Sequence, residues 1–298
     1  MKPPPFAYHA PRDLGAALRT LAEVGAEGGK VLAGGQSLIP MLNMRLAAPG
    51  HLVDINRVAG LDGLEVTPEG VRVGALVRHS DAERAGAHPL LTQALKLVAH
   101  PVIRNRGTVV GSLVHADPAA ELPAVLAVLG GSVRLARWDG GPAGGSPDGG
   151  SAGGAAERSA GGVAVMRDVP AAEFFVGPME SAARPGELAV SAFFPAVEEG
   201  VGVAFHEVAR RHGDYALAGV CALVTPDGRA RVACIGVGPV PVVVELDKLA
   251  GAADAVRAAT DPDDDLHATA AYRRHLVGVL AERALHDAAR EGAAAHGP

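Results

Sequence analysis

A pair of glycines between two apolar runs is the feature of this sequence that most limits its fold. The segment KVLAGGQSLIPML, Lys30–Leu42, reads as a strand, then Gly34 and Gly35, then a helix that we predict to begin at Ser37. Without a Cβ, the glycines let their N–H groups point into one concavity, and with the helix start this predicts an anion-binding turn. A pyrophosphate could lie there without any lysine. On this segment alone, a simple tight connection between strand and helix remains the more common interpretation.

A second glycine-bearing segment, NRGTVVGSLVHADPAAELP, lies at Asn105–Pro123. Thr108, Gly111 and Ser112 combine two hydroxyls with bare backbone ahead of a helix start. Two such loops in one chain favour a shared phosphate-bearing ligand. Neither loop matches GxGxxG or GxxxxGK[ST], which argues against an ordinary Rossmann or P-loop site.

Two carboxylates follow the second loop. Asp117 precedes a proline and Glu121 begins an apolar run that reads as a helix. Carboxylates beside a nucleotide accept hydrogen bonds from sugar hydroxyls, whereas the structural alternative is capping and dipole pairing at the first helical turn. Taken alone, these two residues fit the structural alternative better. His79 and His115 are likewise expected to be structural or solvated.

The remaining pattern is α+β in three parts. Two subdomains, 1–57 and 58–180, precede a third part at 185–298, where strand-like segments from Glu187 onward predict an antiparallel sheet closed by an amphipathic helix. Asp13 is the expected cap of the first helix, and Ser80 that of a single helix over 80–99. The elements predicted besides these are helices over 11–29 and 37–47, strands over 30–35 and 51–58, and a hairpin over 64–77.

Composition excludes several classes of function. The net charge is −6 with Lys and Arg scattered, so no basic face for nucleic acid is visible. Two cysteines, Cys221 and Cys234, are too few for a disulfide scaffold, a zinc site or cluster ligation, and we expect buried free thiols. The segment at 137–162 is rich in Gly, Ser and Ala and is predicted to be a flexible surface loop. HExxH is absent from the sequence, and no catalytic residue or metal ligand is predicted.

The N-terminus lacks the apolar region of a signal peptide, and no run of about 18 uncharged apolar residues suggests a membrane span. The expected location is cytoplasmic.

Taken together, the two glycine segments, VGALVRHSD, FHEVARRHGDYALAGV and the C-terminal AYRRHLVGVLAERAL resemble one family in order along nearly the whole chain. This family is the medium, FAD-binding subunit of molybdenum-containing hydroxylases, of the carbon monoxide dehydrogenase type and related to the flavin domain of xanthine dehydrogenase. The resemblance implies a two-subdomain FAD-binding fold of the vanillyl-alcohol oxidase-like type, followed by a C-terminal domain of antiparallel sheet plus helices. It implies FAD as the cofactor.

The resemblance also implies roles for individual residues. The first segment would bind the FAD pyrophosphate through backbone N–H groups, the second would line the opposite flank, and the carboxylates would bind FAD hydroxyls. His206 would stand where relatives place a lysine near the flavin ring, and Tyr215 would approach that ring. The implied cofactor-binding residues are Leu32, Ala33, Gly34, Gly35, Gln36, Ser37, Leu38, Thr108, Val109, Val110, Gly111, Ser112, Asp117, Glu121, His206 and Tyr215.

Three positions differ from the family pattern as the resemblance aligns it. Val110 adds a Cβ where relatives have a second glycine, which would narrow the flavin site. Val77 lacks the hydroxyl of the family threonine, and His206 replaces a lysine. The segment at 137–162 resembles an insertion.

The implied function is electron transfer. Electrons would arrive from 2Fe–2S clusters in a small partner subunit, leave FAD for an external acceptor, and originate at a molybdenum cofactor in a large partner subunit. The three subunits would form a heterotrimer that dimerises. Two alternatives stay open: a stand-alone FAD oxidoreductase with its own substrate pocket, and a degenerate, non-catalytic subunit kept for assembly.

Overall fold

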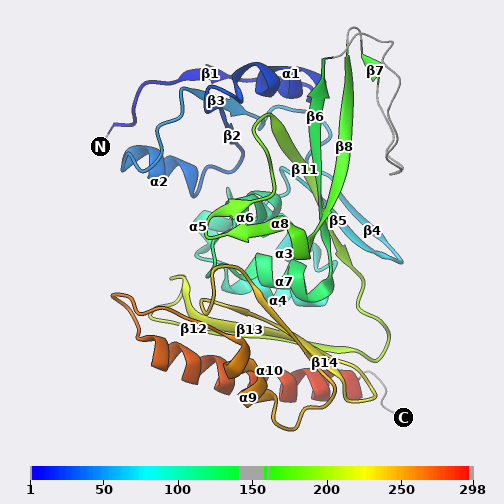
Figure 1. Ribbon diagram of the computed structural model, residues 1–298. Helices are drawn as coiled ribbons and strands as arrows, with labels where there is room; N and C mark the ends of the chain where they lie inside the picture. Colours follow the sequence, from blue (N-terminus) through cyan, green and yellow to red (C-terminus); the bar gives the residue numbers. More distant parts are fainter. Residues whose placement is uncertain (1, 141–157, 160–161, 295–298) are drawn as a thin grey trace.

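The computed structural model describes residues 2–140, 158–159 and 162–294. In Figure 1 a small parallel sheet lies at the upper left, and a six-stranded sheet runs beside it on the right down to a group of helices in the middle. A four-stranded sheet and a final pair of helices lie at the bottom. The predicted α+β fold, with an antiparallel C-terminal sheet and covering helices, is confirmed. Most of the predicted flexible loop, residues 141–157 and 160–161, lies outside the described residues.

The N-terminal part is a three-stranded parallel sheet in the order β1-β3-β2. Helix α1 buries Leu18 and Leu21 between this sheet and the six-stranded sheet. Asp13 caps α1 as predicted, because its Oδ1 accepts a hydrogen bond from the Ala16 N–H at 2.8 Å. The elements of this part are β1 (Ala7–His9), α1 (Leu14–Val24), β2 (Lys30–Leu32), α2 (Leu38–Asn43) and β3 (His51–Asp54).

The central sheet is antiparallel, with strand order β4-β5-β11-β6-β8-β7. The predicted hairpin over 64–77 is confirmed as β4 and β5, joined at Pro68-Glu69. The strands are β4 (Leu64–Thr67), β5 (Gly70–Gly74), β6 (Ser132–Asp139), β7 (Arg158–Ser159), β8 (Gly162–Pro170) and β11 (Glu187–Pro195).

Strand β11 lies in a different sheet from the one that the sequence predicted. The residues from Glu187 form a strand as predicted, but their assignment to the C-terminal sheet is wrong. Strand β11 pairs with β5 on one side and β6 on the other, and so lies inside the central sheet. Its burial explains this place, since Leu188, Val190 and Phe194 are buried from both faces of the central sheet, in two different apolar clusters.

A group of helices fills the space between the central and C-terminal sheets (Figure 1). The single helix predicted over 80–99 is in fact two helices, because Gly86 adopts a left-handed conformation that ends the first. Ser80 lies inside that first helix and is not its cap. The helices are α3 (His79–Ala85), α4 (Pro89–Leu97), α5 (Pro101–Arg104), α6 (Val109–His115), α7 (Glu121–Leu129) and α8 (Ala171–Phe174), with a small hairpin of β9 (Phe175–Gly177) and β10 (Glu180–Ser181).

The C-terminal sheet is antiparallel, in the order β12-β13-β14-β15. Its side chains alternate between two apolar clusters, one shared with α7 and the other with α9 and α10. Cys221 faces the first cluster and Cys234 the second, and both are buried free thiols, as predicted. The elements are β12 (Gly202–Ala209), β13 (Ala216–Val224), β14 (Ala230–Ile235), β15 (Val242–Leu246), α9 (Ala252–Ala259) and α10 (Ala270–Ala294).

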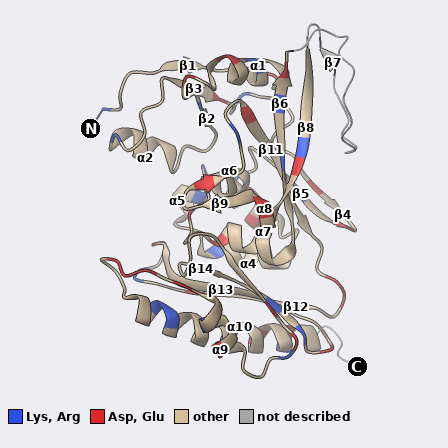
Figure 2. Ribbon diagram, viewed as in Figure 1, with Lys and Arg blue, Asp and Glu red and all other residues tan. Residues whose placement is uncertain are grey.

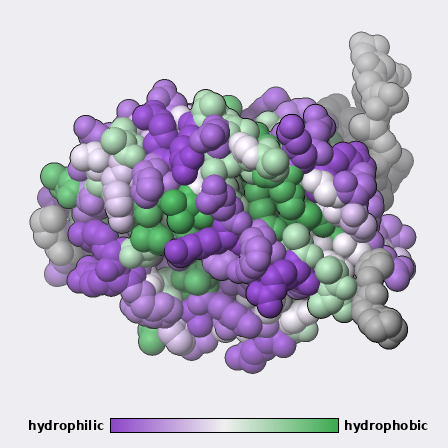
Figure 3. Space-filling view, turned by 90° about the horizontal axis from the view of Figure 1, so that it is seen from below, coloured by the Kyte–Doolittle hydropathy of each residue, from purple (hydrophilic) through white to green (hydrophobic). Residues whose placement is uncertain are grey.

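The surface carries charges of both signs. In the view of Figure 2, Lys and Arg are spread over the layers with Asp and Glu between them. Seen from below, the face that carries α9 and α10 is mostly hydrophilic, with separate apolar areas (Figure 3). Across the part of the chain that the structure describes, no helix is both long and apolar enough to cross a membrane.

Candidate functional site

The two glycine segments meet in the structure. Gly34 is buried against the chain just ahead of Thr108: a Cβ on Gly34 would stand 2.3 Å from the carbonyl oxygen of Arg106 and 2.9 Å from Cα of Gly107. No side chain fits in that space. Gly35 has φ +73°, a left-handed conformation that glycine adopts without strain. The two glycines therefore have different tasks, close packing for Gly34 and a turn for Gly35.

The first segment presents a row of unpaired backbone donors. Within the described residues, none of the N–H groups from Gly34 to Leu38 donates to an acceptor of the protein. The first residue of α2 whose N–H is bonded is Ile39, to the Gly35 carbonyl at 3.0 Å. The Ser37 side chain forms no capping hydrogen bond with α2, which leaves that hydroxyl available too. Successive free N–H groups in a turn are the arrangement that binds phosphate.

The second segment is held by its own side chains. Thr108 caps α6, since its Oγ1 accepts a hydrogen bond from the Gly111 N–H at 3.1 Å. Val109 and Val110 are buried in the apolar cluster under α6, with Val110 only 2% exposed. The expected narrowing of the flavin site by the Val110 side chain is therefore not supported, because that side chain packs into the core.

Two residues missed by the sequence analysis join the segments. The Arg78 guanidinium donates from Nη1 to the Arg106 carbonyl and from Nη2 to Oδ1 of Asn56, both at 2.7 Å. Asn56 in turn donates from Nδ2 to the Ala33 carbonyl at 2.8 Å. Both residues directly follow mostly apolar segments, LVDI and GALV, and a polar side chain at such a place was the available signal.

His79 supports the second segment from beneath, the structural role expected for it. It is 3% exposed, and its Nε2 lies 3.0 Å from the Thr108 carbonyl, so it donates there. Burial lowers its pKa to about 4, so the ring is neutral near pH 7.

The implied hydroxyl-binding carboxylates lie at the other end of α6. Asp117 caps the next turn through the Ala119 N–H at 2.8 Å and lines a cavity of about 800 Å³, together with Tyr215. This volume is in the range of small-molecule sites. Tyr215 is 61% exposed at the cavity, and burial of its hydroxyl together with Asp117 and Glu121 raises its pKa. Glu121, by contrast, is nearly buried, at 7% exposed.

His206 does not lie with these residues. Its Nε2 is 2.9 Å from Oδ2 of Asp287 on α10, on the far face of the C-terminal sheet. The neighbouring Glu207 faces α7 instead, because side chains alternate along β12 and Phe205 is on that same side. The alternation in GVAFHEVA, with Val203 and Phe205 on the inner face, could have identified Glu207 from the sequence.

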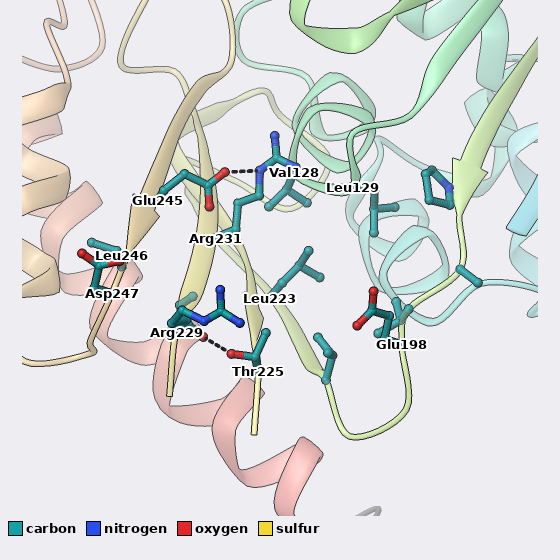
Figure 4. Close-up of a pocket in the computed structure, with 15 residues that line it drawn as sticks. Val128, Leu129, Glu198, Leu223, Thr225, Arg229, Arg231, Glu245, Leu246 and Asp247 are labelled. Atoms are coloured by element: carbon teal, nitrogen blue, oxygen red, sulfur yellow. Dashed lines mark hydrogen bonds and ion pairs between the residues drawn. The ribbon is translucent and has the colours of Figure 1, made fainter. Parts of the chain in front are cut away.

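A second cavity, of about 490 Å³, lies between the end of α7 and β13 to β15 (Figure 4). Arg231 on β14 faces Glu245 on β15 there, with Nε and Oε1 at 2.9 Å. None of the sequence-predicted site residues lines it.

The site fits FAD on its own geometry. The free N–H groups of the first segment suit a pyrophosphate, and the cavity with Asp117 and Tyr215 suits a polar, aromatic group. Helix α6 separates the two regions by about 10 Å, at 1.5 Å per residue, so a long ligand is needed to use both. FAD bound at this site would accept and donate electrons. The chain itself needs no general base for that chemistry.

Comparison with known proteins agrees with this geometry. Residues 4–142 match the FAD binding domain in molybdopterin dehydrogenase, and residues 203–288 match the CO dehydrogenase flavoprotein C-terminal domain. The chain is 36% identical to the 6-hydroxypseudooxynicotine dehydrogenase complex subunit alpha of Paenarthrobacter nicotinovorans, over 96% of this chain and 95% of that one. It is 32% identical to the carbon monoxide dehydrogenase medium chain of Hydrogenophaga pseudoflava, over 97% and 98%.

Solved structures give the same result. A carbon monoxide dehydrogenase from Hydrogenophaga pseudoflava superposes with a TM-score of 0.81 at 32% identity, covering 98% of this chain and 99% of that chain. Quinoline 2-oxidoreductase from Pseudomonas putida 86 superposes with the same score, 0.81, at 31% identity, covering 98% and 99%.

Proposed function

Since this chain belongs to the FAD-binding medium subunits of molybdenum-containing dehydrogenases, we propose that it transfers electrons from 2Fe–2S clusters of a small partner subunit to an external acceptor. Its cofactor is FAD, and its class is oxidoreductase. A large subunit with the molybdenum cofactor would carry out the chemistry on substrate. The three chains would form a heterotrimer that dimerises.

The observation that carries this proposal is the meeting of the two glycine segments. Gly34 packs on Arg106, and the adjacent N–H groups up to Leu38 have no acceptor within the described chain. A row of donors without a partner is stable only if a ligand or water meets it. The pyrophosphate of FAD supplies several acceptor oxygens and a negative charge that these donors favour.

The remaining residues would orient the cofactor. Arg78 and Asn56 fix the two segments relative to each other, and Thr108 fixes the start of α6. Asp117 and Glu121 would meet FAD hydroxyls, and Tyr215 would lie against the ring system. His206 is not assigned to the cofactor, because it pairs with Asp287 on the opposite face of the sheet.

The alternative of a stand-alone oxidoreductase needs an acid–base group at the flavin, and His206 was its one candidate. With His206 not assigned to the cofactor, that alternative has no candidate acid–base group. The proposed location is the cytoplasm. The buried free thiols of Cys221 and Cys234 support this location.

The absorption spectrum of the purified chain is the first test. We expect a yellow protein, or a colourless one that takes up one FAD per chain on reconstitution. A colourless chain that cannot be reconstituted would favour the assembly subunit. A yellow chain whose flavin is reduced by a small substrate without partners would favour the stand-alone enzyme. Stopped-flow reduction of the flavin by a reduced 2Fe–2S partner subunit would support electron transfer.

A variant addresses the phosphate site directly. Gly35→Val is expected to abolish FAD retention while the C-terminal domain stays folded, because φ at this position is +73°. Gly63→Ala is the matched control, since nothing lies within 4 Å of a Cβ there. Unchanged flavin stoichiometry in Gly35→Val would show that the first glycine segment does not bind the FAD pyrophosphate.

A further inference from the structure

The loop that carries Tyr215 lies against the ring of His100. This loop, residues 210–215, joins β12 to β13, and His100 directly precedes α5. A Cβ on Gly213 would stand 2.5 Å, 2.7 Å and 2.8 Å from Cε1, Nε2 and Nδ1 of His100. Three ring atoms at nearly equal distances mean that Gly213 faces the flat side of the imidazole. No Cβ fits between the loop and this ring.

Gly213 suits this contact by its conformation as well as by its size. Its φ is +82°, a left-handed conformation that favours glycine. The ring of His212 adds a second contact, with its centroid 5.6 Å from that of His100 and the two planes at 58°. Through these contacts the loop backbone lies directly on one side chain of the FAD-binding part, residues 4–142.

The backbone on either side of His100 is fixed. Arg104 donates from Nη1 to the carbonyls of Val98 at 2.9 Å and Ala99 at 3.2 Å. The Nε of Arg104 pairs with Glu83 at 2.9 Å, and the His100 carbonyl accepts a hydrogen bond from the Arg104 N–H at 3.0 Å. The His100 side chain forms no capping hydrogen bond with α5. Its ring therefore offers the loop a well-anchored surface without serving the helix.

The short helix α5 also holds the second glycine segment. The N–H groups of Arg106 and Gly107 donate to the Ile103 carbonyl, at 3.1 Å and 2.8 Å. Arg106 and Gly107 are the residues against which Gly34 packs. One end of α5 therefore supports the contact between the two glycine segments, and the other end supports the loop that carries Tyr215.

The loop itself is closed, so a displacement at Gly213 is carried to Tyr215. The Asp214 N–H donates to the Arg211 carbonyl at 3.1 Å, and Oδ2 of Asp214 lies 3.1 Å from Nε of Arg211. Gly213, Asp214 and Tyr215 all line the cavity of about 800 Å³. Since Tyr215 is 61% exposed, its own side chain contributes little to holding it there.

We infer that His100 is a positioning residue for the flavin: its ring supports the loop at Gly213 and so holds Tyr215 against the ring system of FAD. The inference rests on the proposed function, which brings Tyr215 to that ring system. His100 takes no part in the electron transfer itself. The contact requires a flat ring, so phenylalanine can replace this histidine and alanine cannot.

The first test needs no FAD. Trypsin cleaves the full-length apoprotein after Arg210 and Arg211 when the loop opens, and mass spectrometry identifies the fragments. We expect this cleavage to be about tenfold faster in His100→Ala, because a protease acts on the open form of a segment. His100→Phe keeps a ring and should be cleaved like the wild type, as should His275→Ala at an exposed position on α10. Wild-type cleavage in His100→Ala overturns the inference.

The glycine gives an independent check of the same contact. Gly213→Ala brings a Cβ against the ring and should open the loop as His100→Ala does. Gly228→Ala is the matched control and should leave the loop closed, because φ there is +83° and nothing lies within 4 Å of a Cβ. The double variant His100→Ala/Gly213→Ala should be cleaved no faster than the faster single variant, since both changes remove one contact. Effects that multiply would mean that the two residues act separately, which contradicts the inference.

The second test detects Tyr215 at the flavin. A phenol in contact with the isoalloxazine quenches its fluorescence by electron transfer, whereas a phenyl ring does not. At full FAD occupancy, we expect weak fluorescence in the wild type and in His100→Phe, and stronger fluorescence in Tyr215→Phe and His100→Ala. A general loss of stability would not change this signal, so it reports the position of Tyr215. Flavin in His100→Ala that is quenched as in the wild type contradicts the positioning role.

The two tests separate the inference from the proposed function. A chain that binds no FAD, or a Tyr215→Phe variant as weakly fluorescent as the wild type, would overturn the position of Tyr215 at the flavin and the role of His100 that depends on it. Bright flavin in Tyr215→Phe, with quenched flavin and wild-type cleavage in His100→Ala, would leave the proposed function standing and overturn only the role of His100.

Discussion

Gly34 lies directly against Arg106, so closely that a Cβ on Gly34 would stand 2.3 Å from the Arg106 carbonyl oxygen. That carbonyl also accepts a hydrogen bond from Arg78 at 2.7 Å. The same oxygen therefore fixes both the spacing of the two glycine segments and their orientation. Changes at this contact should affect FAD binding without touching any group that reacts.

Gly34→Ala is expected to weaken FAD binding at least tenfold. The added methyl group must push the Arg106–Gly107 backbone away, since no flexible side chain can yield there. Overpacking of this kind costs about 1–3 kcal/mol of stability. Isothermal titration with FAD and thermal unfolding measure the two effects, with Gly63→Ala as the control in open space. An alanine variant with wild-type FAD affinity would show that the contact does not shape the site.

Arg78→Gln is expected to loosen the connection between the segments. It removes two hydrogen bonds from a charged donor, and each such bond contributes about 1.5–3 kcal/mol. FAD dissociation constants and urea unfolding should both change. Arg84→Gln, on helix α3, which directly follows Arg78, is the control: the ion pair of Arg84 with Asp81 is exposed, so its loss should change stability by at most about 1 kcal/mol. Equal effects of the two substitutions would contradict the role of Arg78.

Val110→Gly introduces the second glycine that the family resemblance implies, but should not tighten FAD binding. The Val110 side chain is in the core, so its removal leaves a cavity and puts glycine in a helix, with a loss of about 2–4 kcal/mol. Val102→Gly on α5, where the valine is largely exposed, should cost only about 1 kcal/mol. Urea unfolding and FAD titration measure both. Tighter FAD binding in Val110→Gly would mean that Val110 narrows the site after all.

Because His79 is buried, we expect the folded protein to lose stability in mild acid. The pKa of His79 is about 4 in the folded protein, below the ordinary value of 6.5, so the unfolded chain binds a proton between these values and the folded chain does not. The stability is therefore complete above pH 6.5 and falls as the pH drops toward 4, by on the order of 3 kcal/mol.

Urea unfolding at several pH values would measure this loss in the wild type and in His79→Gln, whose amide can still donate to the Thr108 carbonyl. The variant should lose part of the pH dependence, while His275→Gln, at an exposed position, should keep it. Because His88 and His115 also have lowered pKa values, some dependence remains in every variant.

The parts of the fold that the sequence predicted are those governed by local rules. The cap at Asp13, the hairpin at Pro68-Glu69 and the C-terminal helix depend on neighbours in the chain, and all three are confirmed. The break at Gly86 was missed, because a glycine inside a helical pattern can be tolerated or can end the helix, and φ decides which.

From residue patterns alone, the part of the candidate site that could be predicted is the part whose backbone shape depends on glycine. The sequence indicated Gly34 and Gly35, but their contact with Arg106 depends on how two distant segments pack. Asn56 and Arg78 act through that same packing and carry no motif. At β12, neighbouring side chains point to opposite faces of the sheet, so His206, which pairs with Asp287, is separated from Glu207.

The position of β11 between β5 and β6 has a consequence for synthesis of the chain. Residues 70–74 and 132–139 can form strands early, but they cannot join into one sheet until residue 195 has left the ribosome. Pairing over such distances along the chain is slow, and it leaves strand edges open in the meantime. The cofactor-binding half therefore cannot finish folding before the chain has reached the start of the C-terminal sheet, so a truncation near residue 185 would yield a sheet without its middle strand.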